Sequence, residues 1–316
     1  MVCIFIFIGK FRCINEERGF HMKYDEKIYR PPLEANTLLL QVTSGCSNNK
    51  CTYCNMYKDI NFKMEKLDQI EKDLIEAKGF YPNAQRIYLL NGDPFILSAN
   101  KLRDIAKLIK KHLPEVETIT MYASIQSVAT KTIEELKELK ELGINDLYIG
   151  LESGNDEVLE HVKKGYTAKE ARVQLQRLNE AGIEFFVMVM YGLAGRGKGL
   201  PNAVDTAALL NEVRSKAIFP MSTTLIPGTE LHMEYLKGDF EESAEMERII
   251  ELKTFIEHLN VKDDTRISSL HASNALTLSG SLPRDKQSFI DGLNDFIEKT
   301  DADEFQRSIN RNALRL

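Results

Sequence analysis

Residues 38–54 read LLLQVTSGCSNNKCTYC, an apolar run followed directly by Cys46, Cys51 and Cys54. The run 38–42 predicts a buried β-strand, so the cysteines lie in the loop at its carboxyl end, where folds with parallel strands place their chemistry. The three cysteines have the spacing Cys-x4-Cys-x2-Cys. A chain of 316 residues does not need disulfide staples, so this crowding indicates metal or redox chemistry in a reducing compartment.

The cysteine spacing leaves two kinds of metal site open. Thiolates are soft ligands that suit both iron–sulfur clusters and zinc. A structural zinc usually has four protein ligands, and the nearest further ligands, Cys13 and His21, lie at least 25 residues upstream of Cys46. Three thiolates on a four-iron cluster leave one iron open for a substrate or cofactor. The chain is therefore an iron–sulfur enzyme or a zinc-stabilised α/β binding protein without catalysis.

Beyond residue 38, short apolar runs alternate with helical stretches. Six strand-then-helix units in succession predict parallel strands joined by helical crossovers. Six units fit an open barrel or a doubly wound sheet, and periodicity does not choose between them. We expect a lead-in at 1–37 (of which 1–21 is either native or an appended segment), a barrel unit at 38–262 and an extension packed on it at 263–316. The strands are predicted at 38–42, 86–90, 117–122, 146–151, 185–190 and 217–225.

Polar and glycine-containing segments end the second to fifth strands. Glu152 closes an apolar strand, where a carboxylate needs a partner. Asp93 before a proline is also good turn chemistry, and Ser124 and Ser153 are either ligands or helix caps. In strand order the segments are Asn91-Gly92-Asp93-Pro94, Ser124, Gly150-Leu151-Glu152-Ser153-Gly154 and Tyr191-Gly192-Leu193-Ala194-Gly195.

With these segments in this order, the chain resembles the radical S-adenosylmethionine (SAM) superfamily over roughly residues 38–230. The usual signature there is Cys-x3-Cys-x2-Cys with an aromatic residue before the last cysteine. Tyr53 has the aromatic place, whereas one extra residue separates the first two cysteines. The stretch 150–154, with Lys163-Lys164-Gly165 after it, looks like that of the subgroup containing the tRNA methylthiotransferases and the coproporphyrinogen-oxidase-like proteins.

The resemblance implies a fold class and a set of cofactor residues. The fold is α/β, a partial (β/α)6 TIM-like barrel carrying a C-terminal helical extension. A [4Fe-4S] cluster would be held by Cys46, Cys51 and Cys54. SAM would be bound by residues at the strand ends: Tyr53, Asn91, Gly92, Asp93, Pro94, Ser124, Glu152, Ser153, Tyr191 and Gly192.

The resemblance also implies an activity. An electron donor such as a flavodoxin or ferredoxin would reduce the cluster, and SAM would be cleaved to methionine and a 5′-deoxyadenosyl radical that abstracts hydrogen from a small-molecule substrate. The chain would then be an oxidoreductase or a related radical enzyme. No cysteine follows Cys54, which disfavours methylthiotransferases with a second cluster, and a lead-in of 37 residues is too short for a cobalamin domain. The reaction classes that we still expect are the oxidation or the rearrangement of a small or tetrapyrrole-like molecule.

Composition and net charge limit the classes of binding partner that we expect. The chain is 43% hydrophobic and 28% charged, with a net charge of -6, so it is ordinary for a globular protein and has no basic excess for nucleic acid. The apolar run at 2–8 is far shorter than the ~20 residues that cross a bilayer, and no basic leader or cleavage site accompanies it. We expect a cytoplasmic protein with no membrane partner.

The C-terminal extension is the expected source of substrate contacts. A short strand-like segment at 266–270 could lie beside the sixth strand, and His271 and Asn274 follow it. Because the expected cofactor contacts all precede residue 230, His271 and Asn274 are candidates to face the substrate. The alternative for His271 is a hydrogen bond that satisfies a local carbonyl. Arg30-Pro31-Pro32 with Glu34 forms either part of the substrate entrance or a rigid lead-in.

Overall fold

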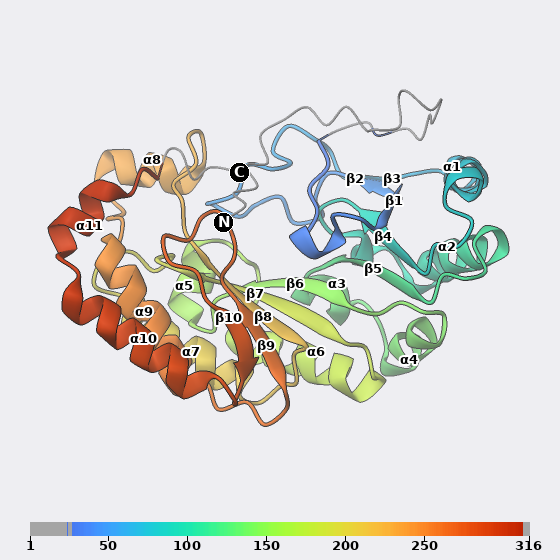
Figure 1. The fold of residues 1–316 in the computed structure, drawn as a ribbon. Coiled ribbons are helices and arrows are strands. Elements are labelled where there is room, and N and C mark those ends of the chain that lie inside the picture. Colours follow the sequence, from blue (N-terminus) through green and yellow to red (C-terminus); the bar gives the residue numbers. More distant parts are fainter. Residues whose placement is uncertain (1–23, 25–26, 312–316) are drawn as a thin grey trace.

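In the computed structural model, the described residues are Tyr24 and 27–311, so the segment 1–21 with Cys3 and Cys13 lies outside them. The described chain is an α/β fold built on an eight-stranded, mostly parallel sheet (Figure 1). Strands β1 to β9 of this sheet pair in parallel, whereas β10 pairs antiparallel with β9. In sheet order the strands are β1 (Leu38–Gln41), β4 (Arg86–Leu90), β5 (Thr118–Ala123), β6 (Leu147–Glu152), β7 (Phe185–Tyr191), β8 (Ala217–Ser222), β9 (Thr265–Ser268) and β10 (Ser279–Leu282).

The predicted succession of parallel strands is confirmed. The strand β9 adds a seventh parallel strand at the segment expected beside the sixth, with Ala217 paired to Arg266 and Ile218 to Ile267. Within the described residues, the edge strands β1 and β10 do not pair with each other. The sheet is therefore open, which is compatible with a partial barrel. A second, two-stranded sheet pairs β2 (Thr43–Ser44) with β3 (Lys63–Met64).

The helices cover the outer face of the sheet, and each long helix packs against the next along the chain. Their starts follow ordinary capping rules. Thr132 and Thr167, for example, cap α4 and α6 in capping boxes. None of the described helices is long and apolar enough to cross a membrane. The helices are η2 (Pro32–Glu34), α1 (Leu67–Phe80), η3 (Pro94–Ile96), α2 (Ala99–His112), α3 (Ile125–Ala129), α4 (Ile133–Glu141), α5 (Asp156–His161), α6 (Ala168–Ala181), α7 (Gly199–Leu210), α8 (Glu230–Lys237), α9 (Glu245–His258), α10 (Lys286–Lys299) and α11 (Ala302–Ser308).

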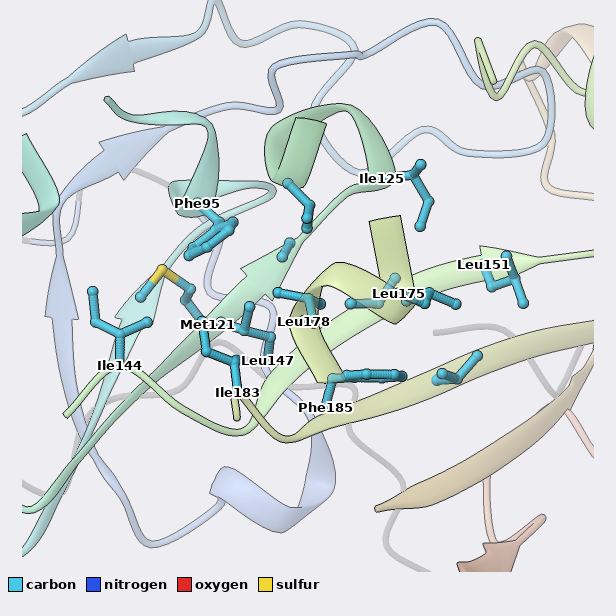
Figure 2. Close-up of a cluster of buried hydrophobic side chains, with 14 of the residues drawn as sticks. Phe95, Met121, Ile125, Ile144, Leu147, Leu151, Leu175, Leu178, Ile183 and Phe185 are labelled. Atoms are coloured by element: carbon cyan, nitrogen blue, oxygen red, sulfur yellow. The ribbon is translucent and has the colours of Figure 1, made fainter. Parts of the chain in front are cut away.

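Alternate residues of the strands point to opposite faces of the sheet, and both faces are apolar, as predicted for a covered parallel sheet. The outward residues join the helices in the main core. Figure 2 shows part of this core, where Leu175 and Leu178 of α6 lie beside Leu147 and Phe185 of the strands. This packing fixes the strands rigidly, so the loops at their ends start from fixed positions.

The inner face of the sheet carries a row of aromatic rings. Tyr122, Tyr148 and Phe186 are in register on β5, β6 and β7, with ring centroids 6.1 Å and 4.6 Å apart. One layer nearer the carboxyl edge, Met188 and Phe219 are in register and are only partly buried. The inner face is thus filled near the amino edge and more open near the carboxyl edge.

A network of ion pairs closes the amino edge. Arg86 binds Glu34 at 2.7 Å and Asp146 at 2.6 Å, Lys216 binds Asp146 at 2.9 Å, and the Tyr148 hydroxyl donates to Glu34 at 2.6 Å. Glu34 is only 1% exposed. Of the two expectations for the segment around Glu34, the structure supports the lead-in, because Glu34 is bound at the edge opposite the cysteine loop.

Candidate functional site

The cysteine loop follows β1 and β2, and backbone hydrogen bonds to other segments hold it in place. Gly45 starts the loop with a φ of +70°, in the left-handed region that favours glycine. The Thr52 backbone N–H donates to the Val162 carbonyl at 3.2 Å, and the Leu231 N–H donates to the Thr52 carbonyl at 2.9 Å. These contacts tie the loop to the end of α5 and the start of α8. Its three cysteines are free thiols of intermediate exposure.

The segment after β4 packs directly on the first cysteine. A Cβ on Gly92 would lie 2.7 Å from the Cβ of Cys46, so only glycine permits this approach. The Asn91 side chain donates from Nδ2 to the Thr43 carbonyl at 2.9 Å. Asn91 was predicted to contact a cofactor, but this contact gives its side chain a role in holding the loop.

Asp93 lies buried beside the loop with one oxygen unsatisfied. Its Oδ2 accepts hydrogen bonds from Ser47 at 2.7 Å and Ser124 at 2.8 Å, whereas its Oδ1 is buried and has no partner among the described residues. Burial raises the pKa of the Asp93 carboxyl. Ser124 also accepts from the Ser127 N–H at 3.0 Å and so caps α3. Of the two roles considered for Ser124, the cap is therefore present.

Glu152 is the second buried carboxylate at this edge. Its φ is +64°, a left-handed conformation that is uncommon outside glycine. A Cβ on Gly150 would collide with Glu152 Oε1, so the glycine leaves room for the carboxylate. That oxygen accepts from Lys164 Nζ at 3.3 Å, and Oε2 is buried without a partner in the part of the chain that the structure describes. The predicted need of Glu152 for a partner is thus met at one oxygen and open at the other.

The electrostatics of the loop depend on burial and on the neighbouring lysine. Burial raises the pKa of the Cys46 and Cys54 thiols, so a bound metal would have to displace their protons. Asn48 Nδ2 donates to the Cys51 sulfur at 3.2 Å. Tyr53 is partly buried against Val162 and its neighbours, and burial raises the pKa of its hydroxyl well above the usual value.

The donor set fits an iron–sulfur cluster. Among the described residues, no three His, Cys, Asp or Glu side chains converge as the ligands of a single metal ion must. Thiolates of a four-iron cluster bind different irons and need not converge on one point. The unpartnered oxygens of Asp93 and Glu152 are acceptors that the ammonium or hydroxyl groups of a bound cofactor can satisfy.

Comparison with known proteins decides the family. The Radical SAM superfamily matches residues 40–198, which is half of the chain. The chain belongs to the radical SAM superfamily. The predicted resemblance is therefore confirmed, and members of this superfamily bind a [4Fe-4S] cluster and SAM.

The curated radical SAM relatives match only part of their own length. The chain is 28% identical to the heme chaperone HemW of Bacillus subtilis over 168 residues, which cover 51% of this chain and 44% of HemW. It is 24% identical to the tRNA-2-methylthio-N(6)-dimethylallyladenosine synthase of Delftia acidovorans over 253 residues, covering 76% of this chain and 56% of that protein. The chain thus spans about half the length of these relatives.

Among solved structures, the radical SAM methyltransferase TsrM from Kitasatospora setae, with cobalamin and a [4Fe-4S] cluster bound, has a similar fold. The TM-score is 0.53 at 16% identity, and the match covers 64% of this chain and 39% of TsrM. At this identity the likeness concerns the fold alone.

Three residues predicted to bind the radical SAM cofactor have hydrogen-bond partners within the protein. Ser153 is fully buried and donates to Asn202 Oδ1 at 2.5 Å. The Tyr191 hydroxyl donates to Asn274 at 2.9 Å, and the Gly192 N–H donates to the Glu251 carboxylate at 2.7 Å. These contacts give each of the three residues a structural role, and their contact with the cofactor stays a prediction.

Asn274, a candidate for substrate contact, is also hydrogen-bonded within the protein. Its Oδ1 accepts from the Ser222 N–H at 2.7 Å, and its Nδ2 donates to the carbonyls of Pro220 at 2.9 Å and Ser269 at 2.7 Å. With Tyr191 also bound, the amide has no group left for a substrate. Asn274 therefore attaches the C-terminal extension to β8 at the carboxyl edge.

Among the described residues, the ring of His271 has hydrogen-bond partners at Nδ1 only. Its Nδ1 accepts the Ser273 backbone N–H at 3.2 Å and lies 2.8 Å from the Ser273 hydroxyl. A backbone N–H can only donate, so Nδ1 carries no proton and the neutral ring is protonated at Nε2. Burial lowers the pKa of His271, which favours this neutral form. The local contact at Nδ1 is therefore with a backbone N–H and not with the carbonyl of the alternative, and the role of His271 toward a substrate stays a prediction.

Two buried lysines near the candidate carboxylates were missed by the sequence analysis. Lys164 belongs to the quoted Lys163-Lys164-Gly165, but only the fold shows that it is buried and Lys163 is not. Lys131 is also buried, donates to the Phe95 carbonyl at 2.6 Å and has a pKa lowered by burial to about 8. Charged residues in a mixed polar stretch give no signal of burial, so neither was accessible from the pattern.

Proposed function

We propose that the protein is a radical SAM enzyme that holds a [4Fe-4S] cluster on Cys46, Cys51 and Cys54. The observation that carries the proposal is the set of three free thiols in the family's position, with the Gly92 backbone packed onto Cys46. When bound, the cluster supplies an electron that cleaves SAM, and the resulting 5′-deoxyadenosyl radical abstracts hydrogen from the substrate.

The chain's own residues bind and orient the cofactor. Asp93 and Glu152 each present one unpartnered buried oxygen to its polar groups. Lys164 stands 3.3 Å from Glu152 Oε1 and keeps that carboxylate in place. Tyr53 covers the loop before the last cysteine, and Gly92 and Pro94 carry the backbone that follows β4. A partly buried, partly apolar setting of this kind limits the access of water to reactive species.

The substrate side of the proposal rests on the inner face and on His271. Tyr122, Met188 and Phe219 are partly exposed there and carry no charge, which suits an apolar small molecule. His271 follows β9 at the carboxyl edge and offers Nε2–H as a hydrogen-bond donor. We infer that the substrate lies against this face, between the aromatic row and the cofactor.

Each reductive cleavage of SAM would take up one electron, which a protein or chemical reductant must supply to the cluster. A flavodoxin or ferredoxin is the partner that the superfamily resemblance implies. The reaction class is then oxidation, or a rearrangement begun by hydrogen abstraction.

A heme-related role is the second candidate, and the similarity to HemW over half of the chain favours it. Under this hypothesis the protein binds heme in addition to its cluster. Titration with hemin separates the two, because heme binding produces a saturable Soret band, whereas a radical enzyme without that role gives only non-saturating absorbance.

The experiment that tests the proposed function is anaerobic reconstitution with iron and sulfide. We expect about four irons per chain, and loss of the cluster in Cys46→Ala, Cys51→Ala and Cys54→Ala. Cys3→Ala and Cys13→Ala are the matched controls and should keep it. A colourless protein with stoichiometric zinc would support the zinc-stabilised binding protein, and a full cluster in any of the three loop variants would contradict the ligand assignment.

A further inference from the structure

A buried carboxylate on α9 has no part in the chemistry proposed above. Glu251 is 2% exposed and uses both of its oxygens. Oε2 accepts the Gly192 backbone N–H at 2.7 Å, and Oε1 accepts from Asn202 Nδ2 at 2.8 Å. A Cβ on Gly199 would lie 2.5 Å from Oε2, so the carboxylate also sits against the first residue of α7. Negative charge is favourable at a helix amino end.

Asn202 connects this carboxylate to the strand that carries Glu152. The Oδ1 of Asn202 accepts from the Ser153 hydroxyl at 2.5 Å, and Ser153 directly follows Glu152. Asn202 belongs to α7. The residue after Ser153 is bound to this helix as well, because the Gly154 N–H donates to Thr206 Oγ1 at 2.8 Å. The path from Glu251 to the end of β6 therefore consists of two hydrogen bonds through one side chain.

The end of β6 needs such support. Glu152 has a left-handed φ of +64°, and a side chain stays in that conformation only where its surroundings hold it. The pairing of β6 with β7 also shifts register between Gly150 and Glu152. The pairing skips Leu151 and resumes with Glu152 opposite Val189, so Glu152 lies beyond a break in the ladder. The contacts of Ser153 and Gly154 with α7 support it from the other side.

We propose that Glu251 is a positioning residue for SAM, acting through Asn202 and Ser153 to hold Glu152 with its free oxygen toward the cofactor. The inference rests on the proposed function. A carboxylate is required because both neighbours present N–H donors. A glutamine there can accept one of them, but its own amide N–H would then face the other donor.

The test is the dissociation constant for SAM of the reconstituted protein, with Glu251→Gln compared with wild type. We expect binding to weaken by about tenfold, the scale of one lost hydrogen bond at a buried site. Iron content should stay at the wild-type level. Glu257→Gln is the matched control, because Glu257 lies on the same helix and pairs with Lys253 at the surface, and it should bind SAM normally.

Two further readouts separate positioning from a general loss of structure. Ser153→Ala cuts the path at its other end, so the double variant Glu251→Gln/Ser153→Ala should bind SAM no more weakly than the weaker single variant. The Gly192 amide should exchange its hydrogen faster in Glu251→Gln, even without cofactor.

The outcomes are distinguishable. A wild-type protein that binds no SAM contradicts the proposed function itself. A wild-type protein that binds SAM, together with an unchanged constant in Glu251→Gln or fully additive losses in the double variant, overturns the positioning role alone.

Discussion

Glu152 combines a strained backbone with a buried charge pair. Its left-handed conformation costs about 1–3 kcal/mol for a residue other than glycine, and its carboxylate is bound to Lys164, which is itself buried. Although burial alone lowers the pKa of Lys164, the acidic groups around it raise the value overall, so the ammonium stays charged. A residue that served only the fold would not need both features.

Removal of this charge should affect the cofactor and the fold separately. We expect Glu152→Gln to weaken SAM binding by about 1–3 kcal/mol, and to lower the free energy of unfolding by a similar amount because Lys164 loses its charged partner. The double variant Glu152→Gln/Lys164→Gln should recover stability but not SAM binding. Calorimetric titration and thermal unfolding measure the two quantities. Normal SAM binding by Glu152→Gln would make Glu152 purely structural.

His271 gives a prediction that needs no substrate. We expect ¹⁵N NMR to find its neutral ring protonated at Nε2, with a pKa below the ordinary value of 6.5 because the ring is buried. His258 is the internal control, because its Nδ1 lies 2.9 Å from the Thr254 carbonyl and must carry the proton there. A pKa of His271 above 6.5, or a proton on Nδ1, would rule out the donor role proposed for Nε2.

At the scale of single residues, the sequence was most informative where a residue type is unusual for its position. Three cysteines within nine residues have few explanations, and a carboxylate ending an apolar strand requires a partner. Ser153, Tyr191 and Asn274 were assigned to ligands because they stand at strand ends, yet each is satisfied by a side chain or backbone group from a distant element. Such partners come together only when the chain packs, so the local sequence contains no pattern that predicts them.

The segment after β4 is the element on which the cysteine loop rests. We expect Gly92→Ala to reduce the iron content after reconstitution, because the new Cβ would stand 2.7 Å from the Cβ of Cys46 and push the loop away. Gly79→Ala is the matched control, since Gly79 lies in α1 with nothing near its Cβ position, and alanine there should leave the cluster intact and the helix slightly more stable. Full iron loading of Gly92→Ala would show that the loop tolerates displacement.

At the scale of elements, periodicity located the six strand-then-helix units because each strand is apolar on both faces. It did not locate β10, whose sequence Ser-Gly-Ser-Leu carries little apolar signal, nor α8, which is only eight residues long. It also could not choose between an open barrel and a doubly wound sheet. The order of the sheet settles that question, because neighbouring strands follow the chain from β1 to β10.

At the scale of the whole molecule, we expect the buried Glu251 to make the free energy of unfolding depend on pH. Burial raises the pKa of Glu251 from 4.5 to about 7. Because the folded protein then holds a proton that the unfolded chain releases, the contribution of this group is present below pH 4.5 and is lost as the pH rises to about 7. Relative to Glu251→Gln, wild type should lose about 3 kcal/mol of unfolding free energy across that window.

Denaturant unfolding of both proteins between pH 4 and pH 8 measures this difference. The comparison cancels the groups that the two proteins share, among them Glu34, whose pKa is lowered overall because its bonds to Arg86 and its other partners outweigh the upward effect of burial. A difference that is constant with pH would mean that Glu251 titrates at its ordinary value.

The most direct test of the central claim is the product of SAM cleavage. Under anaerobic conditions, with dithionite as the reductant and no substrate added, we expect the reconstituted protein to form methionine and 5′-deoxyadenosine in equal amounts, measured by liquid chromatography with mass spectrometry. Cys51→Ala should form neither. A protein that carries its full cluster and binds SAM, yet releases no 5′-deoxyadenosine on reduction, would contradict the assignment of this site to radical SAM chemistry.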